Sequence, residues 1–227
     1  MNNFDCIVSL GYNCYPCMYA EKKDGKIKKE YFFDDIATPA WAIKELLENN
    51  FNGFFDKAEY EKIKLFDRSS YEFLTNKKYY IRFSQFFQIS KLDSLLNLFQ
   101  KKKTNFMNKL QSEQKILFIR NEEPIVSDIP KLSGNRIIYD EYASRYQHKE
   151  LYHLAILSTY LQTTYPNLNF HIMFIANDLN QPIQLNYDSV SKIFTIPNKI
   201  ITTANYEQVI DQIFIDHETF INDSLKL

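Results

Sequence analysis

Glycine is scarce in this sequence, with 4 among 227 residues, and there are 7 prolines. Disordered and low-complexity chains are usually rich in both residues, so the composition excludes that class. An excess of charge of one sign is also missing, because 27 Lys and Arg nearly balance 28 Asp and Glu. With a net charge of −1, the chain has no general attraction for nucleic acid or anionic lipid, and we expect no nucleic-acid partner.

Long hydrophobic runs are absent too, since none reaches the about 20 apolar residues that a membrane-spanning helix needs. Asp5 precedes the first apolar run and no basic segment does, so the N-terminal stretch is unlike a signal peptide. The cysteines are Cys6, Cys14 and Cys17, an odd and clustered set that is typical of reduced thiols. We therefore expect a cytoplasmic protein without a membrane span. The sequence leaves its oligomeric state open.

Aromatic residues are plentiful, with 19 Phe and 16 Tyr, and a chain of this size can bury a large core. Strand-like apolar runs are found at 6–10, 79–83, 116–119, 136–139, 170–176 and 192–196. Helical patterns begin at or near residues 14, 39, 92, 148 and 205. This alternation predicts one α/β domain over residues 1–227: a three-layer sandwich with a mainly parallel, Rossmann-like sheet, and an inserted helical segment around 54–110.

Three local patterns add detail. The charged stretch 21–30 contains Asp24-Gly25 and predicts a solvated turn or hairpin. Thr38-Pro39 predicts a helix that starts with a hydroxyl cap and a proline. The basic run 101–103 predicts a solvated face.

Cys14 is the candidate nucleophile. It follows the first strand-like run and a turn at Gly11, and with Asn13 as N-cap it would be the first helical residue. Backbone N–H groups and the helix dipole stabilise a thiolate over a thiol at this position, and the same N–H groups can hold an oxyanion. The alternative is a small buried residue, which most free cysteines are.

Loops that follow the carboxyl ends of parallel strands build the binding site in such folds. Two of these loops supply candidate substrate-binding residues: Gly11, Tyr12, Asn13, Arg120 and Asn121. The fork of Arg120 suits a carboxylate, a phosphate or a sugar acid. The alternative for Arg120 is an ion pair with Asp34 or Asp35.

One stretch carries a family resemblance. Ser9-Leu10-Gly11-Tyr12-Asn13-Cys14, followed by Pro16, resembles the S-L-G-x-x-C corner of a bacterial family of unknown function described as papain-like cysteine peptidases. Phe33-Asp34-Asp35 with Thr38 resembles its second element, with Asp35 in place of a tryptophan, and 115–120 resembles its I-L-F-I/V-R strand. The resemblance spans roughly residues 5–175. It implies a cysteine-dependent hydrolase or acyl transferase with Cys14 as nucleophile.

The general base is less well defined. The family has a His-Asp-Phe element that corresponds to 83–86 here, where no histidine is present. His148 and His153 open a predicted helix and are the candidate bases, although each could be a surface residue. Asp34 could orient a base, or it could brace the Cys14 loop by accepting N–H hydrogen bonds.

Other chemistry has weaker support. Cys14 and Cys17 form a C-x-x-C pair without a second pair of ligands, so we expect no metal and no cofactor, and a redox role is a minor alternative. His171 lies inside a strand-like run, as a satisfied core residue would. His217 follows an aspartate, an arrangement that serves the nucleophile in GDSL-type esterases by fold-level analogy only.

Three functions therefore stay open. The first is the cysteine-dependent hydrolase or acyl transferase, acting on a small-molecule, peptide or glycan substrate. The second is a glycan- or nucleotide-sugar-dependent transferase in which Arg120 and helix N-termini hold an anionic donor. No glycine-rich phosphate loop supports the second function. The third is a non-catalytic binding module on the same fold.

Overall fold

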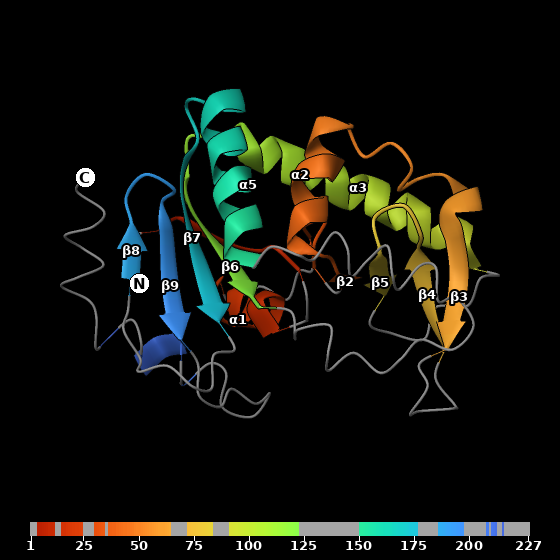
Figure 1. Cartoon of the computed structure of the whole chain (residues 1–227), viewed down its shortest axis with the longest axis horizontal. Helices are drawn as coiled ribbons and strands as arrows, with labels where there is room; N and C mark the ends of the chain where they lie inside the picture. The colour runs from red at the N-terminus through yellow and green to blue at the C-terminus, as the bar shows by residue number, and fades with distance from the viewer. Residues whose placement is uncertain are drawn as a thin grey trace.

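The computed structural model describes residues 4–11, 15–24, 30–34, 36–64, 72–83, 91–122, 150–176, 186–197, 208, 210–212 and 215. Within these ranges the chain forms a five-stranded sheet and a four-stranded sheet that lie side by side (Figure 1). The mixed α/β class predicted from the sequence is confirmed.

The larger sheet has the strand order β1-β6-β7-β9-β8. Its strands are β1 (Cys6–Ser9), β6 (Lys115–Asn121), β7 (Asn169–Ala176), β9 (Ile193–Pro197) and β8 (Asn186–Asp188). The first four run parallel, and β8 pairs antiparallel with β9. The prediction of a mainly parallel sheet is therefore confirmed, and its carboxyl edge lies where β1, β6, β7 and β9 end.

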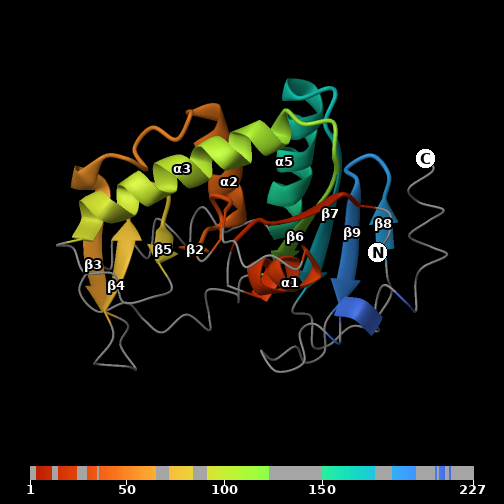
Figure 2. The ribbon, with the colours of Figure 1, turned by 180° about the vertical axis from the view of Figure 1, so that it is seen from behind.

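Successive side chains of a strand point to opposite faces, and both faces of this sheet are buried. On one face, Phe118 of β6 belongs to a core that includes Leu157 of helix α5 (Glu150–Thr164). On the other face, Ile119 belongs to a core that includes Tyr19 of helix α1 (Tyr15–Asp24). Figures 1 and 2 show α5 and α1 on opposite sides of the sheet.

The smaller sheet is antiparallel, in the order β2-β5-β4-β3. Its strands are β2 (Ile36–Ala37), β5 (Ile81–Phe83), β4 (Glu72–Asn76) and β3 (Tyr60–Lys64), and a 3₁₀ turn, η1 (Lys57–Glu59), precedes β3. The segment 54–110 is therefore not an all-helical insertion, because it contributes three strands before its helix. These strands are short and mix charged with apolar residues, so they lack the continuous apolar runs that reveal β1, β6 and β7.

Two helices connect the sheets. Helix α2 (Ala40–Glu48) contacts α5, and helix α3 (Leu92–Leu110) runs along both sheets (Figure 2). In the first half of α3, Phe99 meets Phe83 of β5, with ring centroids 5.4 Å apart. Nearer the C-terminal end of α3, Phe106 meets Phe118 of β6 at 6.3 Å. Helix α3 therefore joins the core of the smaller sheet to the core on the α5 face of the larger sheet.

Aromatic rings fill the space between the smaller sheet and α3. We define the aromatic cluster by its members: Phe32, Phe33, Phe51, Phe54, Phe83 and Phe99, all buried. Phe32 is central, and its ring lies edge-to-face with four of the others at centroid distances of 5.2, 4.5, 4.6 and 5.4 Å. Edge-to-face pairs of this kind are favoured by the ring quadrupole.

Several local predictions need correction. Helix α1 continues through Asp24, so the first part of the stretch 21–30 is helical and not a turn. Lys22 and Lys23 suit the negative end of that helix, and Lys23 also pairs with Asp211. Lys102 does not lie on a solvated face, because it is 6% exposed. Its Nζ lies 5.2 Å from the ring centroid of Phe99.

The strands predicted at 6–10, 116–119, 170–176 and 192–196 are confirmed, with small shifts at their ends. The run 79–83 is a strand only from Ile81 onward, since Tyr79 and Tyr80 form a turn in which Tyr80 has a φ of 53°. The predicted strand 136–139 and helix start at 205 lie outside the described residues. Within the described ranges, no helix has the length and apolar character needed to cross a membrane.

Candidate functional site

The first two strands of the larger sheet end together at its carboxyl edge. In the parallel pairing of β1 with β6, Ser9 lies level with Ile119. Leu10 N–H continues the ladder and donates to Ile119 O at 2.9 Å. Leu10, the residue before Gly11, therefore lies beside Arg120 near the end of β6.

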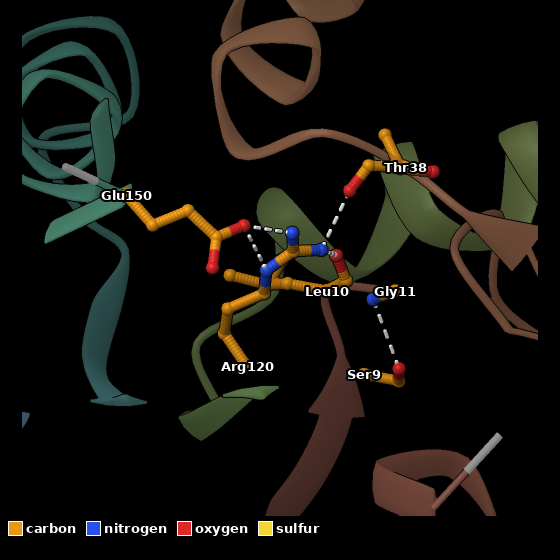
Figure 3. A network of polar contacts seen from close by, with 6 residues as sticks. All are labelled: Ser9, Leu10, Gly11, Thr38, Arg120 and Glu150. Carbon is orange, nitrogen blue, oxygen red and sulfur yellow. Dashed lines mark hydrogen bonds and ion pairs between the residues drawn. The ribbon is translucent and has the colours of Figure 1, made fainter. Parts of the chain in front are cut away.

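Gly11 makes the turn out of β1. Its φ is +82°, in the left-handed region where glycine is favoured, and its N–H donates to Ser9 Oγ at 3.1 Å (Figure 3). A Cβ at this position would lie 3.1 Å from Ile36 O and 3.4 Å from Thr38 Oγ1. The corner therefore needs glycine for its backbone angle and for its close approach to the strand β2.

Arg120 is the centre of a buried polar network, which we call the Arg120 clamp: Arg120, Glu150 and the carbonyl oxygens of Leu10 and Thr38. Nη1 donates to Leu10 O at 3.0 Å and to Thr38 O at 2.7 Å. Nε donates to Glu150 Oε1 at 3.1 Å, and Nη2 donates to the same oxygen (Figure 3). One guanidinium group thus joins β6, the end of β1, the segment before α2 and the first turn of α5.

The position of Arg120 bears on its predicted roles. Its side chain is fully buried, and its described ion pair is with Glu150, whereas Asp34 and Asp35 were the partners considered from the sequence. Asp35 lies outside the described residues. A substrate-binding role for Arg120 stays a prediction, and the burial of its donors inside the clamp counts against it. Asn121 is also buried, at 7% exposure.

Thr38 does not cap α2 as expected. The N-cap position is occupied by Pro39, with φ −58° and ψ 143°, and no side chain makes a cap hydrogen bond there. The Thr38 carbonyl belongs to the Arg120 clamp, while Thr38 Oγ1 is buried and has no hydrogen-bond partner in the described part of the chain. From the Thr38-Pro39 pair, the sequence predicted that this hydroxyl would cap helix α2.

Asp34 is buried at 2% exposure and braces its own turn. Its Oδ2 accepts a hydrogen bond from Tyr31 N–H at 2.8 Å, and its N–H donates to Tyr31 O at 3.2 Å. Lys102 Nζ lies 3.5 Å from the Asp34 carbonyl oxygen, a long hydrogen bond. Asp34 thus accepts a backbone N–H hydrogen bond, as one of the two alternatives predicted. The donor of this bond is Tyr31 of the same turn, whereas the prediction placed the donor in the Cys14 loop.

His153 lies on α5 one turn after Glu150, so the two residues share one side of the helix. It is half-buried, and its ring centroid lies 5.5 Å from that of Tyr152. Because an α-helix rises about 1.5 Å per residue, the backbone of His153 is about 4.5 Å along the helix axis from that of Glu150. Of the two candidate bases, it is the one in the described part of the chain; His148 lies outside it.

His171 is far from this edge. It lies four residues before Ile175, which is level with Asn121, so about 13 Å of strand separates it from the carboxyl edge. The core position predicted for His171 is confirmed, but Nδ1 is buried without a hydrogen-bond partner among the described residues. Burial lowers its pKa to about 4, with smaller contributions from Lys115 and Lys192.

The structure brings Gly11, Arg120 and Thr38 together at one corner. Cys6 and Cys17 are buried and form no disulfide bond. The remaining predicted site residues, Tyr12, Asn13 and Cys14, lie outside the described residues, as does His217. Sequence reasoning missed Glu150, whose only signal was an acidic residue in the first turn of an apolar helix.

Over the ranges that the structure describes, no three His, Cys, Asp or Glu side chains gather closely enough to hold a metal ion. The fold and the corner define a mixed α/β protein with a polar junction at the carboxyl edge of its parallel strands. In comparisons with family models, curated proteins and solved structures, nothing matches this chain.

Proposed function

We propose that this protein is a cysteine-dependent hydrolase or acyl transferase whose nucleophile is Cys14. The observation that carries the proposal is the corner at Gly11. It leaves a parallel strand at the carboxyl edge, and helix α1 begins at Tyr15, the residue that follows Cys14 in the chain.

The electrostatics of such a corner favour a thiolate. The first turn of a helix has backbone N–H groups without helical partners, and the helix dipole places partial positive charge there. Both features lower the pKa of a cysteine thiol, and a thiolate is the form that attacks acyl carbon. No acidic residue lies in the first turn of α1 to oppose this effect.

The proposal also concerns how the layers of the fold are arranged. We infer a three-layer, Rossmann-like arrangement, which the helices on both faces of the larger sheet support. In open α/β sheets of this kind, ligands bind outside the carboxyl ends of the strands. The Gly11 corner and the end of β6 lie at that edge.

The reaction needs a group to accept the thiol proton. His148 and His153 are the proposed bases, and the position of His153 one turn from the Arg120 clamp supports the second. The base takes the proton, Cys14 Sγ bonds to the acyl carbon, and the leaving group departs with the electron pair of its bond. Water then releases the acid in a hydrolase, and another nucleophile takes the acyl group in a transferase.

Two other functions compete with this one. A transferase that holds an anionic glycan or nucleotide-sugar donor on Arg120 has less support, since the guanidinium is committed to Glu150 and two carbonyl oxygens. A non-catalytic binding module would keep the fold without a working base. The substrate class that fits the favoured proposal is a small molecule, peptide or glycan that carries an acyl group.

An acyl probe tests the proposal without knowledge of the substrate. We expect p-nitrophenyl acetate to acetylate Cys14 and to release about one equivalent of p-nitrophenolate per chain in a burst. Cys14→Ser should abolish the burst, whereas Cys17→Ser, which changes a buried thiol, should keep it. An equal burst from the wild type and from Cys14→Ser would remove the nucleophile.

A further inference from the structure

The outer face of helix α5 carries no charge. Residues 151–164 include no Asp, Glu, Lys or Arg, and the one charged residue of the helix, Glu150, is buried in the Arg120 clamp. A helix at a protein surface normally turns charged and polar side chains to the water. The uncharged face of α5 therefore suits contact with another surface better than contact with water.

Four side chains form a line along this face, which we call the α5 stripe: Tyr152, Ile156, Thr159 and Thr163. They lie opposite the side of the helix that packs into the core through Leu154, Leu157 and Leu161. Tyr152 is 52% exposed, both threonines are exposed and Ile156 is half-buried. In Figure 1, α5 lies in front of the larger sheet with α2 beside it, and no other helix or strand of the described ranges covers it.

The two threonines of the stripe act as apolar side chains. The Thr159 hydroxyl donates to Ala155 O at 3.1 Å, and the Thr163 hydroxyl donates to Thr159 O at 2.9 Å and to Tyr160 O at 3.0 Å. Such back-bonds satisfy the hydroxyl within its own helix. A partner that covers the stripe therefore meets the threonine methyl groups, and it leaves neither hydroxyl without a hydrogen bond.

The order of the stripe makes it complementary to itself. Its members are separated by four, three and four residues, a helix-packing spacing that reads the same in both directions. A second α5 laid antiparallel on a two-fold axis places Tyr152 opposite Thr163 of the other copy. The same axis places Ile156 opposite Thr159. Each large side chain thus meets a small one, as side chains that interdigitate between helices require.

The charge of the face favours a second copy as the partner. A two-fold axis brings the same surface patch together from both subunits, so a charged patch would meet like charge. The stripe avoids that repulsion because it has no charged member, and the dipoles of two antiparallel helices also oppose each other favourably.

We propose that two copies of this chain form a two-fold dimer through the α5 stripe, with their α5 helices antiparallel. The stripe is about 16 Å long, so the contact is smaller than a standard interface of about 1,600 Å². We therefore expect a reversible dimer with a Kd in the micromolar range. The inference goes beyond the proposed function and does not depend on it.

Sedimentation equilibrium of the full chain over a range of concentrations tests the dimer. The mass should rise from 27.1 kDa toward about 54 kDa as the concentration increases. Thr159→Glu should raise the Kd at least about a hundredfold, because it brings two like charges together near the axis. A wild-type chain that stays at 27.1 kDa up to its solubility limit would overturn the inference.

Helix α3 offers a matched control for this variant. Thr104 is also an exposed helical threonine, and its hydroxyl donates to Gln100 O at 3.1 Å, the same back-bond that Thr159 makes. Thr104→Glu should leave the Kd unchanged. Far-UV circular dichroism should show the same helix content in both variants, since each substitution is at an exposed position. An equal effect of the two substitutions on the Kd would also overturn the inference.

A charge pair tests the antiparallel arrangement itself. Ile156→Lys alone should weaken the dimer as Thr159→Glu does, because it also places like charges in the interface. The double variant Ile156→Lys with Thr159→Glu places opposite charges across the axis twice. Its Kd should return to within about tenfold of the wild-type value. A double variant that stays as weak as the single ones would contradict the proposed pairing.

Discussion

The Arg120 clamp and the aromatic cluster are both deeply buried, but they hold the chain by different physics. The clamp uses one charged group with fixed donor directions, and its donors together meet oxygens from three different segments. The aromatic cluster uses rings that pack edge-to-face around Phe32. Hydrogen bonds fix positions sharply, whereas ring packing tolerates small changes of shape.

This difference fits the place of each region in the molecule. The clamp is at the carboxyl edge, where it ties Leu10, the residue before Gly11, to Thr38 through their carbonyl oxygens. The aromatic cluster supports the smaller sheet. Of the candidate catalytic residues, Asp34 is the one next to a member of this cluster in the sequence. Directional hydrogen bonds therefore hold the candidate site in place, whereas hydrophobic packing stabilises the smaller sheet beside it.

The largest expected effect comes from breaking the clamp. Arg120→Met should lower the free energy of unfolding by about 3–5 kcal/mol, because Glu150 is left as a buried charge without its partner. Urea denaturation measures this loss. In the smaller sheet, Arg82 on β5 is only partly buried, and Arg82→Met should cost about 1 kcal/mol or less. Equal losses in the two variants would contradict the description of the clamp as the rigid region.

A second prediction concerns a polar group inside an apolar setting. His171 lies among the rings of Phe4, Tyr187 and Phe194, with centroid distances of 5.9, 5.9 and 5.7 Å. Its pKa is lowered to about 4 by burial, and Lys115 and Lys192 are the charged groups that act on it. The folded state therefore binds its proton less readily than the unfolded state does.

The sign follows from that difference. The free energy of unfolding is therefore unaffected by His171 above about pH 6.5, where the ring is neutral in both states. It falls as the pH drops toward 4, because the unfolded state binds the proton first. At pH 5 the loss should be about 2 kcal/mol. Chemical denaturation at pH 7 and at pH 5 measures it, with His171→Phe as the comparison. If His171→Phe shows the same loss as the wild type, another group is responsible.

A smaller effect separates two glycines with nearly the same backbone angle. Gly11 has φ +82° and Gly53 has φ +84°, so alanine strains the backbone at both. At Gly11 the new Cβ meets the backbone oxygen of Ile36, which cannot move, while at Gly53 it meets the flexible side chain of Lys78. We expect a loss of about 2 kcal/mol for Gly11→Ala and about 1 kcal/mol for Gly53→Ala in thermal unfolding. The reverse order would show that the corner is looser than described.

Much of the larger sheet could be predicted from the sequence. β1, β6 and β7 are continuous apolar runs, which is what a strand covered on both faces requires. β3 could not be found in this way, because YEKIK is a short edge strand with three charged residues and neither a continuous apolar run nor a regular alternation. Lys102 was misjudged because a run of three lysines gives no sign that the middle one faces the core.

The candidate site was only partly predictable. The turn at Gly11 follows from glycine after an apolar run, and the structure confirms the turn. The ion pair of Arg120 with Glu150 could not be deduced, because 30 residues separate them and several nearer carboxylates compete in the sequence. The burial of the Thr38 hydroxyl without a hydrogen-bond partner among the described residues is likewise a product of the tertiary fold, since the local pattern predicted a helix cap.

The reactivity of Cys14 tests the central claim most directly. Brief iodoacetamide labelling at pH 6.5, with quantification of the three cysteine-containing peptides, compares Cys14 with Cys6 and Cys17, which are 5% and 2% exposed. The account predicts that Cys14 is alkylated well before the other two and that its labelling rate stays high below pH 7, as a lowered thiol pKa requires. Labelling of Cys14 only as the pH approaches 8.5 would contradict it.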